Sequence, residues 1–396
     1  MTVDTGTMPA SRSRDSIFTN PKVRSIVIQV ALILGLSVFV WWIVGNTAQN
    51  LQNANIASGF GFLSTRSGFD ISQVPIPYTN NATYGRAILV GLTNTLIVAG
   101  TGIVFATILG FLIGIGRLSH NALVRGISTV YVETFRNIPP LLVILFWYFG
   151  VLAVLPQPRQ AIELPFDSYI SNRGLQTPSV QFGPEAWLTF AAFIVGIVAT
   201  IALSSAFKAR QLRTGERPGL LLPALALIIV LPIGVFVAAG LPATLQIPQR
   251  GTFNLTGGFQ IRPEFLSIFL ALSVYTGAFI AEIVRAGILS VSKGQTEAAA
   301  ALGLRRGQGL RLVIVPQAFR VIIPPLTSQY LNLIKNSSLG LAIGYPDLVA
   351  VGSTVLNQSG QSIEVVVIWM AVYLGISVTV SIIMNLFNRR MKLIER

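Results

Sequence analysis

Long apolar stretches separated by short polar or basic segments run along almost the whole chain. Eight of them are candidate transmembrane helices, at roughly 25–45, 87–116, 138–155, 187–207, 219–241, 263–289, 315–334 and 365–387. A helix needs about 20 mostly apolar residues to cross a bilayer, and irregular backbone is not tolerated against lipid. The pattern therefore predicts an all-α polytopic membrane protein with about eight transmembrane helices.

The first stretch, 25–45, has two interpretations, a signal peptide or a retained anchor. Basic residues precede it, as they do in signal peptides, but it lacks a convincing small-residue cleavage site. Its length and its two tryptophans, Trp41 and Trp42, favour a helix that stays in the membrane.

Glycine and proline residues inside two of the stretches predict how those helices pack and where one of them is irregular. Gly110 and Gly114 lie four residues apart on the long second stretch, which favours close approach of another helix. Pro324 and Pro325 remove two backbone donors from the seventh stretch. We therefore expect that helix to bend or unwind, and irregular backbone at membrane depth usually lines a transport cavity.

The composition agrees with a membrane protein and excludes several other classes. Of the 396 residues, 52% are hydrophobic and 11% charged, and mean hydropathy is +0.68, whereas a soluble domain has about 25% charged residues. Cysteine is absent and His120 is the single histidine, so we expect no disulfide and no metal site. The net charge of +14 would suggest nucleic acid in a soluble protein, but here it is expected to set topology.

Lysine and arginine are distributed unevenly between alternate connections. The segments 1–24, 117–137, 208–217, 290–314 and 389–396 carry 19 of the 28, whereas the opposite segments carry seven. Positive residues are retained on the cytoplasmic side. We therefore expect tails 1–24 and 389–396 to be cytoplasmic, with both termini inside and loop 290–314 facing the cytoplasm.

The segments expected on the other side, 46–86, 156–186 and 242–262, are rich in Asn, Gln, Ser, Gly and Pro. They are too long for tight turns and too polar to be buried. We expect solvated external loops.

The cytoplasmic loop 290–314 has the pattern of a compact helix–turn–helix. Four alanines follow Glu297 and favour a helix over 295–302, and Gly303 is placed to end it in a left-handed conformation. A second short helix is expected through Arg311, turning into the next span at Pro316. Glu297 either caps backbone amides there or pairs with an arginine of a partner protein.

Polar side chains in and beside the spans are candidate contacts for a solute. They are Thr93, Asn94 and Thr95 on the second stretch, and Asn332, Lys335, Asn336, Ser337 and Ser338 at the end of the seventh. Lys335 and amide hydrogens suit a carboxylate, while amide and hydroxyl oxygens suit an ammonium group. The alternatives are snorkelling of Lys335 to the interface and helix–helix hydrogen bonding by the others.

Two acid–base pairs are spaced to share a helix face. Glu282 and Arg285 lie at positions i and i+3 within a span, and Glu133 and Arg136 have the same spacing in a cytoplasmic segment. A charge pair inside a span is a functional-site hypothesis by default. We expect structural ties or a gate near the cytoplasmic end, and no catalytic residue.

Several motifs resemble the permease subunits of bacterial ABC importers. Glu297-Ala298-Ala299, then Gly303, and then Val313, Val315 and Pro316 are similar to their EAA loop, with valines in place of Ile and Leu. The runs 131–142, 275–287, 316–325 and 332–348 are similar to the histidine/glutamine-type polar amino-acid permeases in particular. The length resembles the general L-amino-acid members of that family.

The resemblance implies a type I importer core of five helices, in parts 87–155 and 263–388. The departures from the shortest members are the extra N-terminal helix 25–45 and an insert, 156–262, with two more spans. The implied location is the bacterial inner membrane, and the implied solutes are polar or general L-amino acids.

The resemblance also implies partners. Loop 290–314 would bind an ATPase subunit, two copies per complex, through Glu297, Ala298, Ala299, Gly303 and Arg305. ATP and Mg²⁺ would bind that subunit, with no cofactor in this chain. A second related permease would complete a heterodimer, and a periplasmic amino-acid-binding protein would land on the external segments.

The chain contains no Gly-x4-Gly-Lys-Ser/Thr phosphate loop. It is therefore expected to be a non-catalytic gate that a separate motor drives. The alternative is an autonomous ion-coupled amino-acid transporter, which would need buried carboxylates along an ion path, and the spans offer little beyond Glu282. A membrane enzyme would need a His/Cys/Asp cluster that the chain lacks.

Overall fold

The computed structural model describes residues 21–53, 58–216, 218–251 and 254–391. Within them, seven helices are long and apolar enough to cross a membrane, and counting one bent helix pair as a span gives eight. This confirms the prediction of a mostly helical chain with about eight membrane helices. Most of the two predicted tails, at 1–20 and 392–396, lies outside the described residues.

The described helices and shorter helical turns follow one another along the chain. The helices are α1 (Pro21–Asn53), α2 (Tyr84–Gly116), α3 (Ala122–Asn137), α4 (Pro140–Leu145), α5 (Ala186–Thr214), α6 (Leu221–Leu225), α7 (Leu231–Ala238), α8 (Pro263–Leu289), α9 (Lys293–Ala301), α10 (Arg306–Gly309), α11 (Val315–Asn336), α12 (Leu348–Ser359) and α13 (Ser362–Met391). The turns are η1 (Phe60–Ser64), η2 (Phe146–Leu152), η3 (Pro158–Gln160), η4 (Ala226–Val230), η5 (Leu310–Ile314) and η6 (Ser337–Ile343).

Helices α2 and α8 form the centre of the bundle, and small residues let them approach. A Cβ atom at Gly110 would lie 2.5 Å from the Ile280 side chain, and one at Gly114 would lie 2.7 Å from the Ala281 carbonyl oxygen. The predicted close-packing face is therefore present. Helix α11 packs on α8 and α13, and α12 packs on α2.

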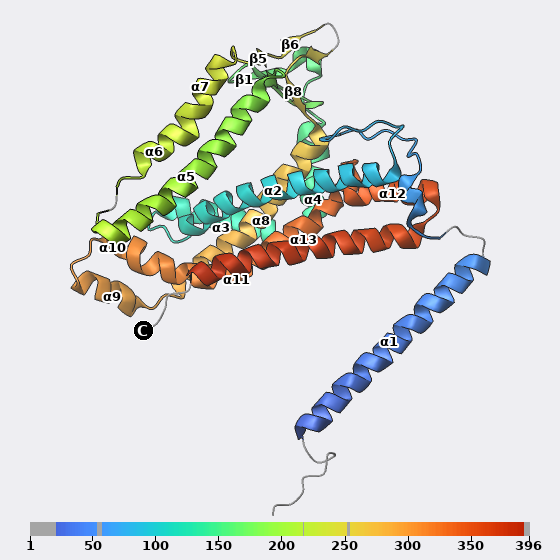
Figure 1. Cartoon of the computed structure of the whole chain (residues 1–396), viewed down its shortest axis with the longest axis horizontal. Coiled ribbons are helices and arrows are strands. Elements are labelled where there is room, and N and C mark those ends of the chain that lie inside the picture. The colour runs from blue at the N-terminus through green and yellow to red at the C-terminus, as the bar shows by residue number, and fades with distance from the viewer. Residues whose placement is uncertain (1–20, 54–57, 217, 252–253, 392–396) are drawn as a thin grey trace, which may run out of the picture.

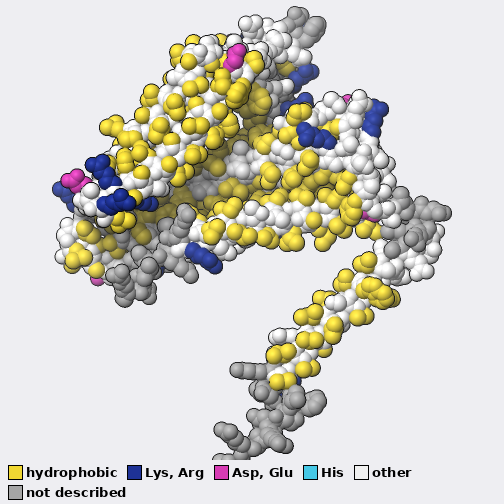
Figure 2. Space-filling view, viewed as in Figure 1, with side chains coloured by type: hydrophobic (Ala, Val, Ile, Leu, Met, Phe, Trp, Pro, Cys, Tyr) yellow, Lys and Arg dark blue, Asp and Glu magenta, His cyan; other side chains and the backbone are white. Residues whose placement is uncertain are grey.

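The helices of the insert form a separate arm. Helix α5 pairs with α6, η4 and α7, and Gly196 of α5 lies directly against the backbone of Leu227. In Figure 1 this arm diverges from the core, and α1 stands apart from both. Figure 2 shows hydrophobic side chains along the lengths of these helices and Lys or Arg near their ends, as expected for helices surrounded by lipid.

The segments of the insert that were predicted to be external loops contain short paired strands. Strands β1 (Ile162–Leu164), β2 (Ser168–Ser171), β3 (Gly174–Thr177) and β8 (Phe259–Ile261) form an antiparallel sheet in that order. Strand β4 (Ser179–Phe182) pairs with β5 (Ala243–Gln246), and β6 (Gln249–Arg250) with β7 (Leu255–Thr256). Strand β3 pairs with β8 across the two insert helices, a long-range contact that composition does not reveal.

Within the predicted span 138–155, the helical segment runs over Pro140–Leu152 and is shorter than predicted. Helix α4 and the π-helical η2 end at Leu152, and they are bent by 110° from α3. Ile138 is extended, at φ −102° and ψ 133°, because the ring of the following Pro139 disfavours a helical conformation there.

Helix α11 does not unwind at its prolines, although unwinding was one of the two outcomes expected there. It is helical through Pro324 and Pro325, and the irregular turns lie at its two ends, in η5 and η6. Neighbouring helices pack on both sides of α11, and proline is tolerated inside membrane helices held in this way. The second short helix of loop 290–314 likewise runs through η5 into α11 without a turn at Pro316.

Candidate functional site

Three groups of residues carry the candidate functions. They are a buried polar cluster, an ion-pair cluster and the projecting loop 290–314. The polar cluster lies where α2 meets the segment between η6 and α12. Asn94 is fully buried, and its Nδ2 donates to the carbonyl oxygens of Gln73 and Pro346, at 2.9 Å each. Thr95 Oγ1 accepts a hydrogen bond of 3.0 Å from the Leu348 amide. These bonds fix α12 against α2.

Asp347 and Tyr345 complete this cluster, and sequence reasoning did not single them out. The Tyr345 hydroxyl donates to the Asn94 carbonyl oxygen at 2.8 Å. Asp347 Oδ1 accepts from the Ala350 amide at 2.7 Å and caps α12, while its Oδ2 is buried without a hydrogen-bond partner among the described residues. Asn94 Oδ1 is unpartnered in the same way. An aspartate next to apolar spans was the available signal, since buried acids are rare.

Asp347 lies between two candidate membrane spans, Gly307–Ile343 and Ser362–Arg389. It is fully buried, and burial raises the pKa of its carboxyl group to about 6 because the charged form loses its water. Hydrogen bonds from backbone amides oppose this shift without cancelling it.

Most of the other predicted solute contacts are not gathered around this cluster, although Ser337, like Thr95, lies beside the Tyr373 hydroxyl next to it. Asn332 and Lys335 are exposed on α11, and Asn336 is half-buried. The hydroxyls of Ser337 and Ser338 donate to the carbonyl oxygens three residues earlier, at 2.7 and 2.8 Å. Thr93 is half-buried, and its hydroxyl donates to the Leu89 carbonyl oxygen at 2.7 Å. These serine and threonine hydroxyls are satisfied by their own helical turns.

The ion-pair cluster centres on Glu282 of α8. Arg285 Nη2 lies 2.6 Å from Glu282 Oε1, so the pair that their spacing allows is present. Arg117, at the end of α2, donates to Glu282 Oε2, and Arg136 of α3 lies 4.0 Å from the same oxygen. Three arginines from three helices thus surround one carboxylate.

Glu133 and Arg136, which have the same spacing, do not pair with each other within 4 Å. Glu133 instead accepts from Arg117 at 3.4 Å, and Arg136 also lies over the Phe279 ring, 5.5 Å from its centroid. The cluster therefore ties α2, α3 and α8 together at one end of the bundle.

The loop 290–314 folds as a projecting knob at the same end of α8. Helix α9 ends at Ala301, and Gly303 has a left-handed φ of +73°, as predicted. The Leu304 amide donates to the Ala299 carbonyl oxygen at 3.1 Å, which satisfies the end of the helix. Glu297, Ala298, Gly303 and Arg305 are exposed, whereas Ala299 is buried.

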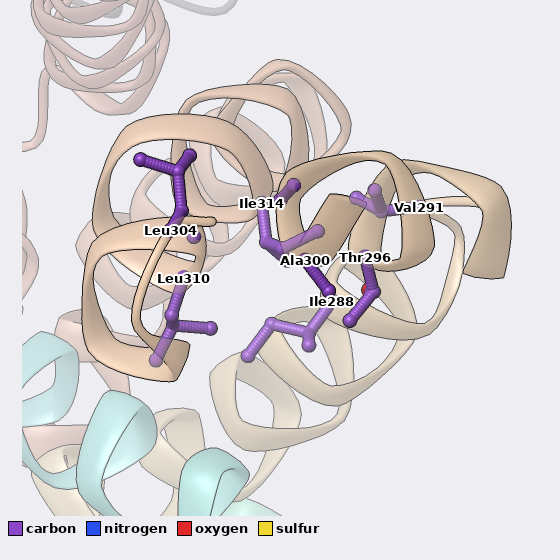
Figure 3. Close-up of a pocket in the computed structure, with 9 residues that line it drawn as sticks. Ile288, Val291, Thr296, Ala300, Leu304, Leu310 and Ile314 are labelled. Carbon is purple, nitrogen blue, oxygen red and sulfur yellow. The ribbon is translucent and has the colours of Figure 1, made fainter. Parts of the chain in front are cut away.

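A cavity of about 610 Å³ lies inside the knob. Figure 3 shows Ile288, Ala300, Leu304, Leu310 and Ile314 around it, so most of its wall is apolar. Gln317 Nε2 donates to Gln295 Oε1 at 3.0 Å and links α9 to α11 beside the cavity. The knob is thus tied to the membrane helices but not packed solidly against them.

The chain has relatives among known proteins, and these identify its family. Residues 219–393 match the family described as "Binding-protein-dependent transport system inner membrane component". The chain is 57% identical to the general L-amino acid transport system permease protein AapQ of Rhizobium johnstonii, over 96% of this chain and 95% of that protein. It is 44% identical to BztB, the glutamate/glutamine/aspartate/asparagine transport system permease protein of Rhodobacter capsulatus, over 95% of both chains.

A similar putative amino-acid ABC transporter permease protein, YhdX of Escherichia coli, is 50% identical over 96% of this chain and 97% of its own. Among solved structures, that of an amino acid ABC transporter with histidines matches 78% of this chain and 95% of its own at 20% identity, with a TM-score of 0.46. The family match and the long, highly identical relatives show that this chain belongs to the binding-protein-dependent inner-membrane permeases, among those of polar amino-acid ABC transporters.

Proposed function

We propose that this permease passes L-amino acids, polar ones in particular, across the bacterial inner membrane into the cytoplasm. As the multi-pass membrane component of a binding-protein-dependent ABC system, it works with an ATPase and a binding protein. The amino-acid solutes are supported by the names of relatives that align with nearly the whole chain. Their mixed acidic and amide solutes favour a broad rather than a single-solute specificity for this chain.

The single observation that carries the coupling role is the geometry of the knob. Helix α9 projects beyond the end of α8, and Glu297 on it is exposed. None of the ion pairs among the described residues includes Glu297. A free carboxylate on a short projecting helix is suited to an arginine on an ATPase subunit, with Ala298, Gly303 and Arg305 beside it.

The proposed assembly contains two ATPase subunits and a second, related permease in a heterodimer. The core of this chain is proposed to consist of the parts 87–155 and 263–388. Both termini of this chain are proposed to be cytoplasmic, which is supported by the lysine and arginine bias. Helix α13 ends at the same end of the bundle as α9 (Figure 1), so the C-terminus and the knob are proposed to share the cytoplasmic side. The insert 156–262 would then place its sheets outside, where the binding protein docks.

The proposed path for the solute runs beside α2 and α11. Asn94 and Thr93 on α2 would contact it together with Asn332, Lys335, Asn336, Ser337 and Ser338. Because the serine hydroxyls are satisfied in this state, contact with a solute would require η6 to move. The Glu282 cluster would act as the gate or tie below this path, and Pro324 and Pro325 would limit hydrogen bonding along α11.

The first experiment replaces Glu297 by Lys, with Glu216→Lys as the matched control. Both residues are exposed acids, and both are proposed to face the cytoplasm. Uptake of radiolabelled L-glutamate by cells and co-purification of the ATPase in mild detergent would be measured. Glu297→Lys is expected to reduce uptake at least tenfold and to lose the ATPase, because like charges would meet across the contact.

Retention of the ATPase and of normal uptake in Glu297→Lys would contradict the coupling role. Uptake that continues in the absence of any ATPase and follows an ion gradient would instead favour the alternative, an ion-coupled transporter.

A further inference from the structure

A cavity of about 330 Å³ lies where the insert leaves the core. One wall is the external segment around Gln73 and Val74, another is Ile97 of α2, and the third runs from Phe259 of β8 to Phe265 of α8. Phe259 belongs to the insert, so the cavity exists only because strand β8 pairs with β3 and returns to the core. Its volume is within the range of small-ligand sites.

Arg262 is the only cation among the residues that line this cavity. It is exposed, and no carboxylate among the described residues lies within ion-pair distance of its guanidinium group. The lining contains no Asp or Glu. The neighbouring acid, Glu264, is half-buried and forms no ion pair with Arg262. The lining therefore offers one positive charge and no negative charge, which suits a ligand that carries a single anionic group.

The rest of the lining is mainly apolar, and the apolar surface continues into the membrane. The Phe265 ring stacks on Phe269, with centroids 5.9 Å apart, and Phe269 meets Phe105 edge to face at 4.9 Å. Phe105 is 55% exposed and lies two helical turns from Ile97 on α2. Aromatic surface thus leads from the cavity along the outside of two membrane-spanning helices.

The cavity also lies at the level where a span begins. Arg262 directly precedes the candidate span Pro263–Leu289, whereas Phe269 and Phe105 lie further along the candidate spans of α8 and α2. A ligand there would have its anionic group at the membrane surface and its apolar part in the hydrocarbon region. A free amino acid fits less well, because its ammonium group would find no carboxylate in the lining.

We propose that this cavity binds an anionic phospholipid, with the headgroup phosphate on Arg262 and the acyl chains along Phe265, Phe269 and Phe105. The lipid would fill the angle between the insert and the core and hold the arm in place. This site is separate from the proposed solute path and the knob, and it does not depend on which solute is transported.

The test uses the full-length chain, purified in mild detergent and stripped of lipid, titrated with a fluorescent phosphatidylglycerol. Two variants are compared with the unmodified chain: Arg262→Gln removes the cation, and Val74→Trp fills the cavity without changing charge. Arg66→Gln is the matched control, because Arg66 is an exposed arginine in the same external region that does not line the cavity. Arg262→Gln is expected to weaken binding about fivefold, since one arginine near a membrane surface contributes roughly that factor.

Val74→Trp is expected to weaken binding as well, and Arg66→Gln to leave it unchanged. Equal affinity of the Arg262→Gln and Arg66→Gln variants would overturn the site. If the unmodified chain bound phosphatidylcholine as tightly as phosphatidylglycerol, the net charge of the headgroup would not be recognised. That result would also overturn the proposed site. If millimolar inorganic phosphate alone displaced the fluorescent phosphatidylglycerol, the site would bind a free anion rather than a lipid, and the proposal would be wrong.

Discussion

At the scale of single residues, buried charge distinguishes the functional regions from the surrounding apolar bundle. Glu282 is surrounded by three arginines, whereas Asp347 has a buried oxygen with no partner among the described residues. The arginines around Glu282 compensate the free-energy cost of removing its charge from water, whereas Asp347 has no such compensation. The two carboxylates should therefore respond oppositely to neutralisation.

Replacing Asp347 by Asn is expected to stabilise the protein at neutral pH. The carboxyl pKa is raised from 3.8 to about 6 in the folded state, so the folded protein binds more protons between these values. Stability then falls as pH rises from about 4 to about 6, and the full cost of the buried charge, roughly 3 kcal/mol, is present above that window. Asn caps a helix as well as Asp does.

Thermal unfolding of the detergent-solubilised protein at pH 7.5 and at pH 4.5 would measure this effect. The variant should unfold at a higher temperature than the unmodified protein at pH 7.5, with the difference shrinking at pH 4.5. A variant that is less stable at pH 7.5 would show that Asp347 is ionised and has a partner.

Replacing Glu282 by Gln is expected to have the opposite effect. The substitution would leave Arg117, Arg136 and Arg285 close together without the carboxylate. The free energy of unfolding is expected to fall by roughly 1–3 kcal/mol. Glu133→Gln is the control, because Glu133 is more exposed and has one long contact of 3.4 Å with Arg117. Its loss of unfolding free energy is expected to be less than about 1 kcal/mol. Denaturant unfolding in detergent would compare them, and equal losses would contradict the central position of Glu282.

At the scale of elements, the contact between α2 and α8 depends on the absence of side chains. Gly110 has Ile280 against it, whereas Gly100, ten residues earlier on the same helix, has nothing within 4 Å of its Cβ position. The contrast follows from helix geometry, because the two positions face different sides of α2.

Gly110→Leu is therefore expected to separate α2 from α8 and to lower the free energy of unfolding by about 1–3 kcal/mol, as overpacking in a dense interior does. Gly100→Leu should be tolerated, since its added side chain would lie in open space. Yield of monodisperse protein and its unfolding temperature would be measured for both. Similar behaviour of the two variants would contradict the close approach at Gly110.

At the scale of the whole molecule, the proposed topology places the knob and the insert sheets on opposite sides of the membrane. Figure 1 places them at opposite ends of α8. The chain has no cysteine, so a single introduced cysteine can report its side without further changes.

Gln181→Cys on β4 and Leu302→Cys after α9 are both exposed positions. A membrane-impermeant maleimide is expected to label Gln181→Cys in intact spheroplasts, and Leu302→Cys only after the membrane is opened. The reverse order of labelling would show that the topology is the opposite of the one proposed. The knob would then lie on the side of the membrane that a cytoplasmic ATPase does not reach.

The sequence by itself determined what depends on local spacing and composition. Apolar length predicted the number of spans, the glycine after an alanine-rich helix predicted the end of α9, and the i,i+3 spacing predicted the Glu282–Arg285 pair. Each of these follows from neighbours within a few residues, for which helix geometry gives a definite answer.

Only the tertiary structure decided what depends on contacts between distant segments. Arg117 contacts Glu282, 165 residues away, and Asn94 contacts Pro346, 252 residues away. Strand β8, which pairs with β3, forms one wall of the Arg262 cavity. It also showed that α11 remains helical through Pro324 and Pro325. Such contacts are set by how whole helices and strands pack, and no local pattern of residues specifies that packing.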